Sequence, residues 1–258
     1  MWPKPLFWTV HWYGIMIALG VAACFAVLYF YARPKKINEN FIDFVFYNGV
    51  ASIAAGFGSA ALFQAFYDFI ANPAAGFHIN GGITFIGGLI GGAGFFLIVY
   101  FLLRRRLSGR LIDVLSLIPC CILVAHGFGR IGCFCAGCCY GKPTDSFLGV
   151  QFPGLPGPVH PTQLYEAAFL FLMFGICSYL WLRRNFQYNM PLYLITYGIF
   201  RFCIEYLRDD YRGSLVGGLS PSQFWSLLMV VGGIALIFLL RPLLARRAAE
   251  RLAAEQKD

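Results

Sequence analysis

Charged residues are scarce in this chain of 258 residues, where Asp, Glu, Lys and Arg together make up only 12% of the sequence. Hydrophobic residues make up 59%, and the mean hydropathy is +0.67. A soluble core buries one or two helices that are apolar on every side, but it does not bury nearly every long segment of a chain. The composition therefore excludes a soluble globular domain and predicts an integral membrane protein.

The sequence also lacks the patterns of three other classes of protein. The formal net charge is +8, but no basic face is interleaved with aromatic residues, so we expect no nucleic-acid partner. Internal repeats, which are common in transporters, are not evident. The first apolar run is not preceded by a basic segment or followed by a small-residue cleavage site, so we expect it to remain as a membrane span.

Apolar stretches of roughly 17 to 25 residues predict an all-α bundle of about seven transmembrane helices. They lie near residues 12–31, 45–70, 82–103, 112–129, 163–182, 189–208 and 222–241. We expect residues 1–258 to form a single transmembrane domain. Its basic cytoplasmic tail, residues 242–258, is expected either to lie as a helix on the inner membrane surface or to be solvated.

Lys and Arg are distributed unevenly between alternate connections, which predicts the orientation. One side collects 14 of the 20 basic residues. These are Arg33, Lys35, Lys36, Arg104, Arg105, Arg106, Arg110, Arg183, Arg184, Arg241, Arg246, Arg247, Arg251 and Lys257. Because positive residues are retained in the cytoplasm, an odd number of spans places the N-terminus outside and the C-terminus inside. The segment from about 130 to 162 then becomes the longest external connection.

The sixth predicted span contains charges that need an explanation, because a charge at the centre of a bilayer costs about 2.5 to 3.5 kcal/mol on insertion scales. Arg201, Glu205 and Arg208 are spaced i, i+4 and i+7, which places them on one helix face. A rise of about 1.5 Å per residue carries Arg201 into the outer half of the bilayer. Taken alone, this pattern also fits a buried ion pair that holds helices together.

A second arginine, Arg130, falls at a similar depth at the expected outer end of the fourth span, with His126 one turn before it. Two guanidinium groups from different helices, with few acidic partners, suit a phosphate group, which they bind through paired charge-assisted hydrogen bonds. A phospholipid headgroup is the phosphate present at that depth. We therefore predict that Arg130 and Arg201 bind an anionic phospholipid.

Other polar residues on the external side have both structural and functional interpretations. His160 and Thr162 suit a helix cap, whereas Glu166, which apolar residues follow, is expected to point inward and balance an arginine or accept a proton. Tyr13 and its neighbours suit an aromatic belt at the membrane interface. The glycine-rich stretch 81–92 predicts close helix packing, or a floor beneath a glycerol or acyl group.

Four of the nine cysteines follow Arg130 in a C-x-C-x-x-C-C pattern, as Cys133, Cys135, Cys138 and Cys139. They fit disulfides or small packing residues in an oxidising compartment. They also fit a soft-metal site, although the spacing is not a standard zinc or iron–sulfur pattern, or a thiolate activated by Arg130 that carries a lipid or acyl group. The remaining cysteines lie in predicted spans and are interpreted as packing residues.

Five blocks of sequence, taken in order, resemble those of the bacterial prolipoprotein diacylglyceryl transferase family. They are HWYG at 11–14, GGITFIGGLIG at 81–91, GRIGCF at 129–134, HPTQLYE at 160–166 and YGIFRFCIE at 197–205. The resemblance covers nearly the whole chain. Five ordered blocks together with a seven-span layout are far more specific than one short motif.

The resemblance implies transfer of the diacylglyceryl group of phosphatidylglycerol to the lipobox cysteine thiol of a prolipoprotein, in the bacterial cytoplasmic (inner) membrane. It implies no cofactor, no metal and no covalent enzyme intermediate. The candidate catalytic residues are Arg130, Arg201, His126, Tyr197 and Glu166. The candidate substrate-binding residues are Tyr13, His11, Gly87, Gly88, Gly132, Gly141, His160, Gln163, Tyr165, Glu205 and Arg208. The two catalytic arginines would stabilise negative charge on the departing phosphate.

This chain departs from the family pattern at three positions. Ile86 stands where the family has a histidine, and Cys133 and Cys138 stand where it often has Asn and Glu. The identity of the general base therefore stays open. The candidates for it are His126, Glu166, Tyr13 and Tyr197. Two alternatives follow: a divergent lipid-dependent transferase that uses the cysteines 133–139, and a non-catalytic protein that binds or transports phospholipid.

Overall fold

The computed structural model describes residues 11–79, 82, 84–208 and 219–255. Its α-helices are α1 (Trp12–Ala32), α2 (Glu39–Ala71), α3 (Phe85–Leu103), α4 (Leu111–Val114), α5 (Ile118–Ala136), α6 (Thr162–Arg184), α7 (Asn189–Ile204) and α8 (Pro221–Glu255). Short 3-10 helices are η1 (Arg33–Lys35), η2 (Pro73–Ala75) and η3 (Glu205–Leu207). Within these described ranges β-structure is limited to isolated bridges, so the prediction of an all-α protein is confirmed.

Five helical segments of the described chain are long and apolar enough to cross a membrane. They are Trp12–Lys35, Glu39–Ile70, Ile118–Ala136, Thr162–Arg184 and Pro221–Glu250. A shorter apolar helix covers Gly87–Leu103. α7 has 16 residues and carries several of the predicted site residues.

The helix that corresponds to the fourth predicted span, 112–129, begins and ends later in the chain than expected. The chain turns between α4 and α5, and Pro119 lies in the first turn of α5. Proline has no N–H to continue a helix and disfavours helical backbone in the residue before it, so a new helix begins there. α5 then continues through Arg130 and ends where Gly137 adopts a left-handed conformation, with φ of 71°. Arg130 therefore lies inside the helix, and the connection that follows it is 137–161.

Two other helices are longer than predicted. α2 begins at Glu39, before the expected residue 45, because the Asn38 side chain caps it by accepting a 3.2 Å hydrogen bond from the N–H of Phe41. α8 continues beyond residue 241 to Glu255. The basic tail therefore has helical backbone as far as Glu255, while its position at a membrane surface stays a prediction.

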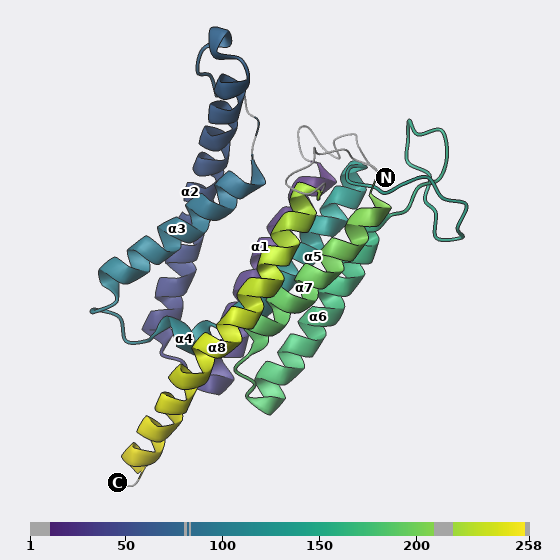
Figure 1. The fold of residues 1–258 in the computed structure, drawn as a ribbon. Coiled ribbons are helices and arrows are strands. Elements are labelled where there is room, and N and C mark those ends of the chain that lie inside the picture. The colour runs from purple at the N-terminus through teal and green to yellow at the C-terminus, as the bar shows by residue number, and fades with distance from the viewer. Residues whose placement is uncertain (1–10, 80–81, 83, 209–218, 256–258) are drawn as a thin grey trace. The chain divides into compact units, whose positions relative to one another are not determined.

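The helices divide between two compact units, and each is described by itself. One unit, Ala32–Asp113, contains α2 and α3, which pack closely through small residues. The other contains α1, α5, α6, α7 and α8, which lie side by side in Figure 1. Within this five-helix unit the most extensive contacts pair α5 with α6 and α7 with α8.

Two buried side chains, those of Asn189 and Trp181, join helices of the five-helix unit near the end of α6 and the start of α7. Asn189, fully buried at the start of α7, donates hydrogen bonds of 3.1 Å to the carbonyl of Ser116 and 3.0 Å to that of Cys177. The Trp181 indole of α6 donates a 3.1 Å hydrogen bond to the Tyr31 carbonyl of α1. Each bond satisfies a polar group that burial would otherwise leave unpaired.

Candidate functional site

A single buried carboxylate, Glu166, joins three helices of the five-helix unit. It lies in the second turn of α6 with its side chain 1% exposed. Tyr197 of α7 donates a 2.7 Å hydrogen bond to its Oε1, and Arg130 Nε of α5 lies 3.0 Å from its Oε2. His126 Nε2 lies 3.6 Å from Oε1, and its ring packs edge-on against Tyr197. Four of the predicted catalytic residues are thus brought into one cluster.

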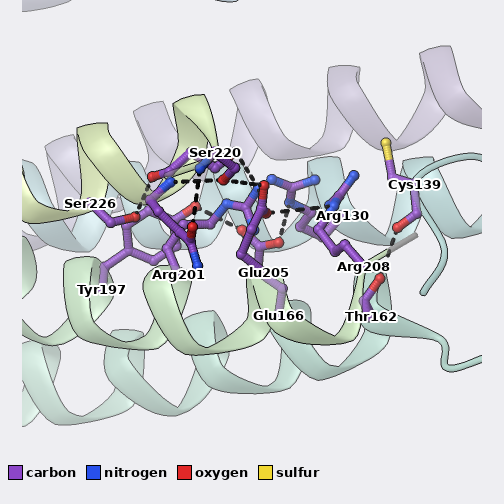
Figure 2. Close-up of polar contacts among 12 residues, drawn as sticks. Arg130, Cys139, Thr162, Glu166, Tyr197, Arg201, Glu205, Arg208, Ser220 and Ser226 are labelled. Atoms are coloured by element: carbon purple, nitrogen blue, oxygen red, sulfur yellow. Dashed lines mark hydrogen bonds and ion pairs between the residues drawn. The ribbon is translucent and has the colours of Figure 1, made fainter. Parts of the chain in front are cut away.

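The fifth, Arg201, lies one turn after Tyr197 on α7 and is paired with a different carboxylate. Its Nη2 lies 2.8 Å from Glu205 Oε2 and donates a 2.9 Å hydrogen bond to Ser222 Oγ of α8. Arg208 Nε lies 3.8 Å from the same oxygen of Glu205. The three residues that the helical spacing placed on one face therefore contact one another, and Figure 2 shows them beside Glu166 and Arg130.

The start of α8 supplies residues that the motif analysis missed. Ser220 Oγ accepts a 3.2 Å hydrogen bond from the N–H of Gln223, and Gln223 Oε1 accepts one of 3.1 Å from the N–H of Ser220. This reciprocal pair is a capping box, with Pro221 at the first helical position. Ser220 Oγ also donates a 2.8 Å hydrogen bond to Glu205 Oε1. The sequence Ser-Pro-Ser-Gln before an apolar run was the signal that would have found this cap.

Among the described residues of this cluster, arginines outnumber glutamates. Arg130, Arg201 and Arg208 face Glu166 and Glu205. Moreover, Arg201 Nη1 is buried and has no hydrogen-bond acceptor among the residues described. A buried donor without an acceptor, in a group of several arginines, favours an anionic ligand with several oxygen atoms.

The connection 137–161 is attached to the end of α7. The N–H of Lys142 donates a 2.7 Å hydrogen bond to the carbonyl of Leu207, and Gly141 forms an isolated bridge with Arg208. A Cβ atom at Gly141 would overlap the carbonyl of Leu207, so only glycine permits this approach. This attachment holds Arg208 beside the segment that carries the cysteines.

The four clustered cysteines separate into three that meet and one that does not. Cys133, Cys138 and Cys139 have sulfur atoms that all lie within 4.8 Å of one another, whereas Cys135 is outside this group. All nine cysteines lie in the described part of the chain, where no disulfide joins them. Hydrogen bonds from the thiols of Cys133 and Cys138, together with the nearby Arg208 guanidinium, lower the pKa of Cys139 against the opposing effect of burial.

Gln163 and Thr162, the first residues of α6, contact the cysteine segment through its backbone. Gln163 Nε2 donates a 2.5 Å hydrogen bond to the Cys138 carbonyl, and Thr162 Oγ1 donates one of 2.8 Å to the Cys139 carbonyl. Both side chains are 1% exposed. Gln163 was a predicted binding residue, but the structure places its amide on protein backbone, and a role in binding stays a prediction.

The other predicted binding residues of this unit have neighbours other than Glu166. His160 Nδ1 lies 3.3 Å from the Tyr165 hydroxyl, away from the cluster of Glu166 contacts. His11 is exposed just before α1, while Tyr13 of α1 packs against Gly132, where a Cβ atom would lie 3.2 Å from the Tyr13 ring. Gly132 thus allows α1 and α5 to approach closely, and its role in binding stays a prediction.

Gly87 and Gly88 belong to the two-helix unit and are described apart from the arginine cluster. A Cβ atom at Gly87 would lie 2.5 Å from Phe63 Cβ of α2, and one at Gly88 would lie 3.4 Å from Ala60 Cβ. Close packing therefore accounts for these glycines, although Gly88 also lines an apolar groove between α2 and α3. Ile86 lies in the first turn of α3, and its side chain is outside the described part of the chain.

The long apolar helices and the buried cationic cluster define a multi-pass membrane protein with a polar site suited to an anion. The family model of prolipoprotein diacylglyceryl transferase matches residues 5–239. The chain belongs to the prolipoprotein diacylglyceryl transferase family.

Three relatives show how similar the chain is to other members. A phosphatidylglycerol–prolipoprotein diacylglyceryl transferase of Clostridium tetani is 36% identical over 236 residues, which cover 87% of this chain and 91% of that protein. Proteins of the same name are 35% identical over 243 residues in Coxiella burnetii, covering 88% and 90%, and 34% identical over 246 residues in a Marinomonas species, covering 89% and 88%. The similarity therefore extends over both units.

Proposed function

We propose that this protein transfers the diacylglyceryl group of phosphatidylglycerol to the lipobox cysteine thiol of a prolipoprotein. Family membership and the names of the relatives support this reaction. The observation that carries it to this chain is the buried guanidinium nitrogen Arg201 Nη1, which has no hydrogen-bond acceptor among the described residues. The phosphate of the lipid would supply the missing acceptor oxygens.

In this proposal Arg130 and Arg201 bind the phosphate from two sides. The acceptor sulfur attacks the glycerol carbon, the bond from that carbon to the phosphate oxygen breaks, and glycerol phosphate leaves with the electron pair. Both arginines stabilise the charge that grows on the departing phosphate, and they are fixed beforehand by Glu166 and Glu205. Tyr197 positions Glu166 through its 2.7 Å hydrogen bond.

The acceptor thiol must lose a proton before or during this attack. His126 is the candidate acceptor for that proton, because its ring is 28% exposed and its Nε2 is directed toward a buried carboxylate 3.6 Å away. Glu166 itself is bound to Arg130 and Tyr197, which reserves it for positioning.

We further propose a single transmembrane domain with seven spans in the cytoplasmic (inner) membrane of a bacterium, formed by α1, α2, α3, α5, α6, α7 with η3, and α8. The uneven distribution of Lys and Arg supports an external N-terminus and a cytoplasmic C-terminus. This orientation places the arginine cluster toward the outer leaflet, where the acceptor protein arrives after translocation.

The test uses the purified full chain in phospholipid nanodiscs, with phosphatidylglycerol labelled in its acyl chains and a peptide that contains a lipobox cysteine. We expect label to move to the cysteine peptide, and not to a matched peptide with serine at that position. Arg201→Gln is expected to slow transfer by about 10²- to 10³-fold, the usual effect of removing one preorganised group that stabilises an anion. Arg184→Gln, at the exposed end of α6, is the matched control.

The result that would overturn the proposal is also defined. If the chain binds labelled phosphatidylglycerol in a manner that Arg201→Gln abolishes, yet transfers no label under conditions in which the Clostridium tetani relative does, the protein binds lipid without transferring it. Release of glycerol phosphate without a labelled peptide would instead indicate a different acceptor.

A further inference from the structure

Three thiols come together beyond Arg130, although the end of α5 separates Cys133 from Cys138 and Cys139. Cys133 lies in the last turns of α5, and Cys138 and Cys139 follow the end of that helix. The three sulfur atoms lie within 4.8 Å of one another, and Cys138 Sγ donates to the Cys133 carbonyl at 3.6 Å. Cys133 is three residues after Arg130, so the two side chains lie on the same side of α5.

The backbone that presents these thiols is held by its neighbours and does not depend on the thiols themselves. Cys139 has a φ of 65°, a left-handed conformation that is unfavourable for a residue other than glycine. The buried side chains of Gln163 and Thr162 hold the carbonyls of Cys138 and Cys139 on both sides of this strained residue. Such strain persists only where the surroundings impose it, and the sulfur of Cys139 lies within 4.8 Å of that of Cys133.

A positive charge accompanies the three thiols. Arg208 lies beside Cys139, where the bridge between Arg208 and Gly141 holds it. Its side chain is 3% exposed. A group of thiolates beside a guanidinium is better balanced in charge than one in an apolar setting, and thiolates are the form that binds metal ions.

We propose that Cys133, Cys138 and Cys139 form a three-thiolate site for a thiophilic d10 metal ion such as zinc, and that its open fourth position binds the acceptor thiol. Zinc–sulfur bonds of about 2.3 Å in a tetrahedral arrangement place sulfur atoms about 3.8 Å apart. The observed cluster needs only small side-chain movements to reach this spacing. Soft thiolate ligands select such ions, and three protein ligands with one open position are typical of catalytic zinc.

The role of the fourth position rests on the proposed function. On binding the metal, the acceptor thiol releases the proton that His126 is proposed to accept, because a coordinated thiol is deprotonated. The metal-held sulfur then attacks the glycerol carbon while the phosphate leaves, so no oxidant or reductant is required. Because Cys133 lies one turn from Arg130, the attacking sulfur would be placed next to the arginines that bind the phosphate.

The first experiment measures metal binding directly. The full chain is purified under reducing conditions in detergent micelles, exchanged into buffer without reductant or chelator, and titrated with cobalt(II), which reports thiolate ligands by a charge-transfer band in the near ultraviolet. We expect one cobalt per chain, displaced by one zinc. Replacing any one ligand, as in Cys133→Ser, Cys138→Ser or Cys139→Ser, is expected to reduce the band strongly, whereas Cys203→Ser, at an exposed free cysteine of α7, leaves it unchanged.

Three results would overturn the site. They are the absence of a charge-transfer band, a band of full intensity in all three ligand variants, and a band lost equally in the Cys203→Ser control. A chain isolated without reductant that lacks metal and whose intact mass is two hydrogens low would show a disulfide as the native state of this cluster. Circular dichroism of every variant verifies that the helices are retained.

The second experiment tests the fourth position. Adding the lipobox peptide to the cobalt protein is expected to shift the visible ligand-field bands, and the serine peptide is expected to leave them unchanged. Identical spectra with both peptides would overturn a role in binding the acceptor. Because these spectra do not depend on turnover, the two proposals fail separately: cobalt binding without label transfer defeats the proposed function, and label transfer by a metal-free chain defeats the role of the metal.

Discussion

Tyr197 donates a 2.7 Å hydrogen bond to Glu166, and this contact joins α7 to α6 at the point where Arg130 of α5 approaches the other carboxylate oxygen. Three helices therefore share one buried charge. Removing either neighbour leaves a charged group with fewer partners in a medium that solvates it poorly. The first two predictions test the two sides of this relationship.

Replacing Glu166 by Gln keeps the shape of the side chain but leaves Arg130 buried without its counter-charge. We expect a loss of stability of about 3 to 5 kcal/mol, the usual cost of breaking a buried ion pair by removing one partner. Thermal unfolding in detergent, followed by circular dichroism, measures this change. Asp145→Asn, in the exposed part of the connection 137–161, is the control, and an equal effect of both variants would contradict the prediction.

Replacing Tyr197 by Phe removes only the hydroxyl that contacts Glu166. A hydrogen bond to a charged group contributes about 1.5 to 3 kcal/mol, so we expect a smaller loss of stability than for Glu166→Gln together with slower label transfer. The same two measurements apply. Tyr179→Phe, whose side chain is 52% exposed on α6, should leave both unchanged. Full activity of Tyr197→Phe would show that Glu166 is positioned without it.

The capping box at the start of α8 gives a third prediction. Ser220→Ala removes the N-cap and the hydrogen bond to Glu205, so we expect a loss of about 1 kcal/mol in stability and weaker lipid binding. Binding of labelled phosphatidylglycerol, measured at equilibrium, separates these two effects. Ser108→Ala, exposed between α3 and α4, serves as the comparison. Unchanged lipid binding would show that Glu205 holds Arg201 without Ser220.

Close approach of α7 and α8 gives a fourth prediction. A Cβ atom at Gly198 would lie 2.8 Å from the Ser226 carbonyl, so Gly198→Ala should push α8 away and separate Arg201 from Ser222. We expect lower stability and slower transfer. At Gly175 of α6 nothing lies within 4 Å of the same atom, so Gly175→Ala should be neutral or stabilising by up to about 1 kcal/mol. Equal effects of the two alanines would contradict the packing argument.

The buried amide of Asn189 gives a fifth prediction, which concerns stability alone. Asn189→Leu leaves the carbonyls of Ser116 and Cys177 without their donor, so we expect a loss of about 1 to 3 kcal/mol. Lipid binding measured below the unfolding temperature should be retained, because the site lies at the other end of the bundle. Gln187→Leu, whose amide bonds only to the nearby Asn185 carbonyl, is the control. A stable Asn189→Leu variant would refute this account.

Local spacing was sufficient for the parts of the site that lie on one helix. Arg201 and Glu205 meet because the helical repeat brings positions i and i+4 together. Arg208 follows the 3-10 helix η3 with extended backbone, so its approach to Glu205 depends on how the helix ends. The sequence did not place Arg130 correctly relative to its helix end. The charge of Arg130 was interpreted as the end of a helix, whereas α5 continues past it. Glu166 of α6 compensates this charge.

The sequence by itself determined that this is an all-α membrane protein and to which family it belongs. It also predicted which charged residues share a helix face. Apolar runs, helical periodicity and ordered motifs are all properties of the chain. Only the tertiary structure decided the pairing of Glu166 with Tyr197, the cap that Ser220 shares with Glu205, and the meeting of three thiols held by Thr162 and Gln163. These contacts join residues on different helices or across a turn with positive φ angles, so their geometry follows from how the helices pack and where each one ends.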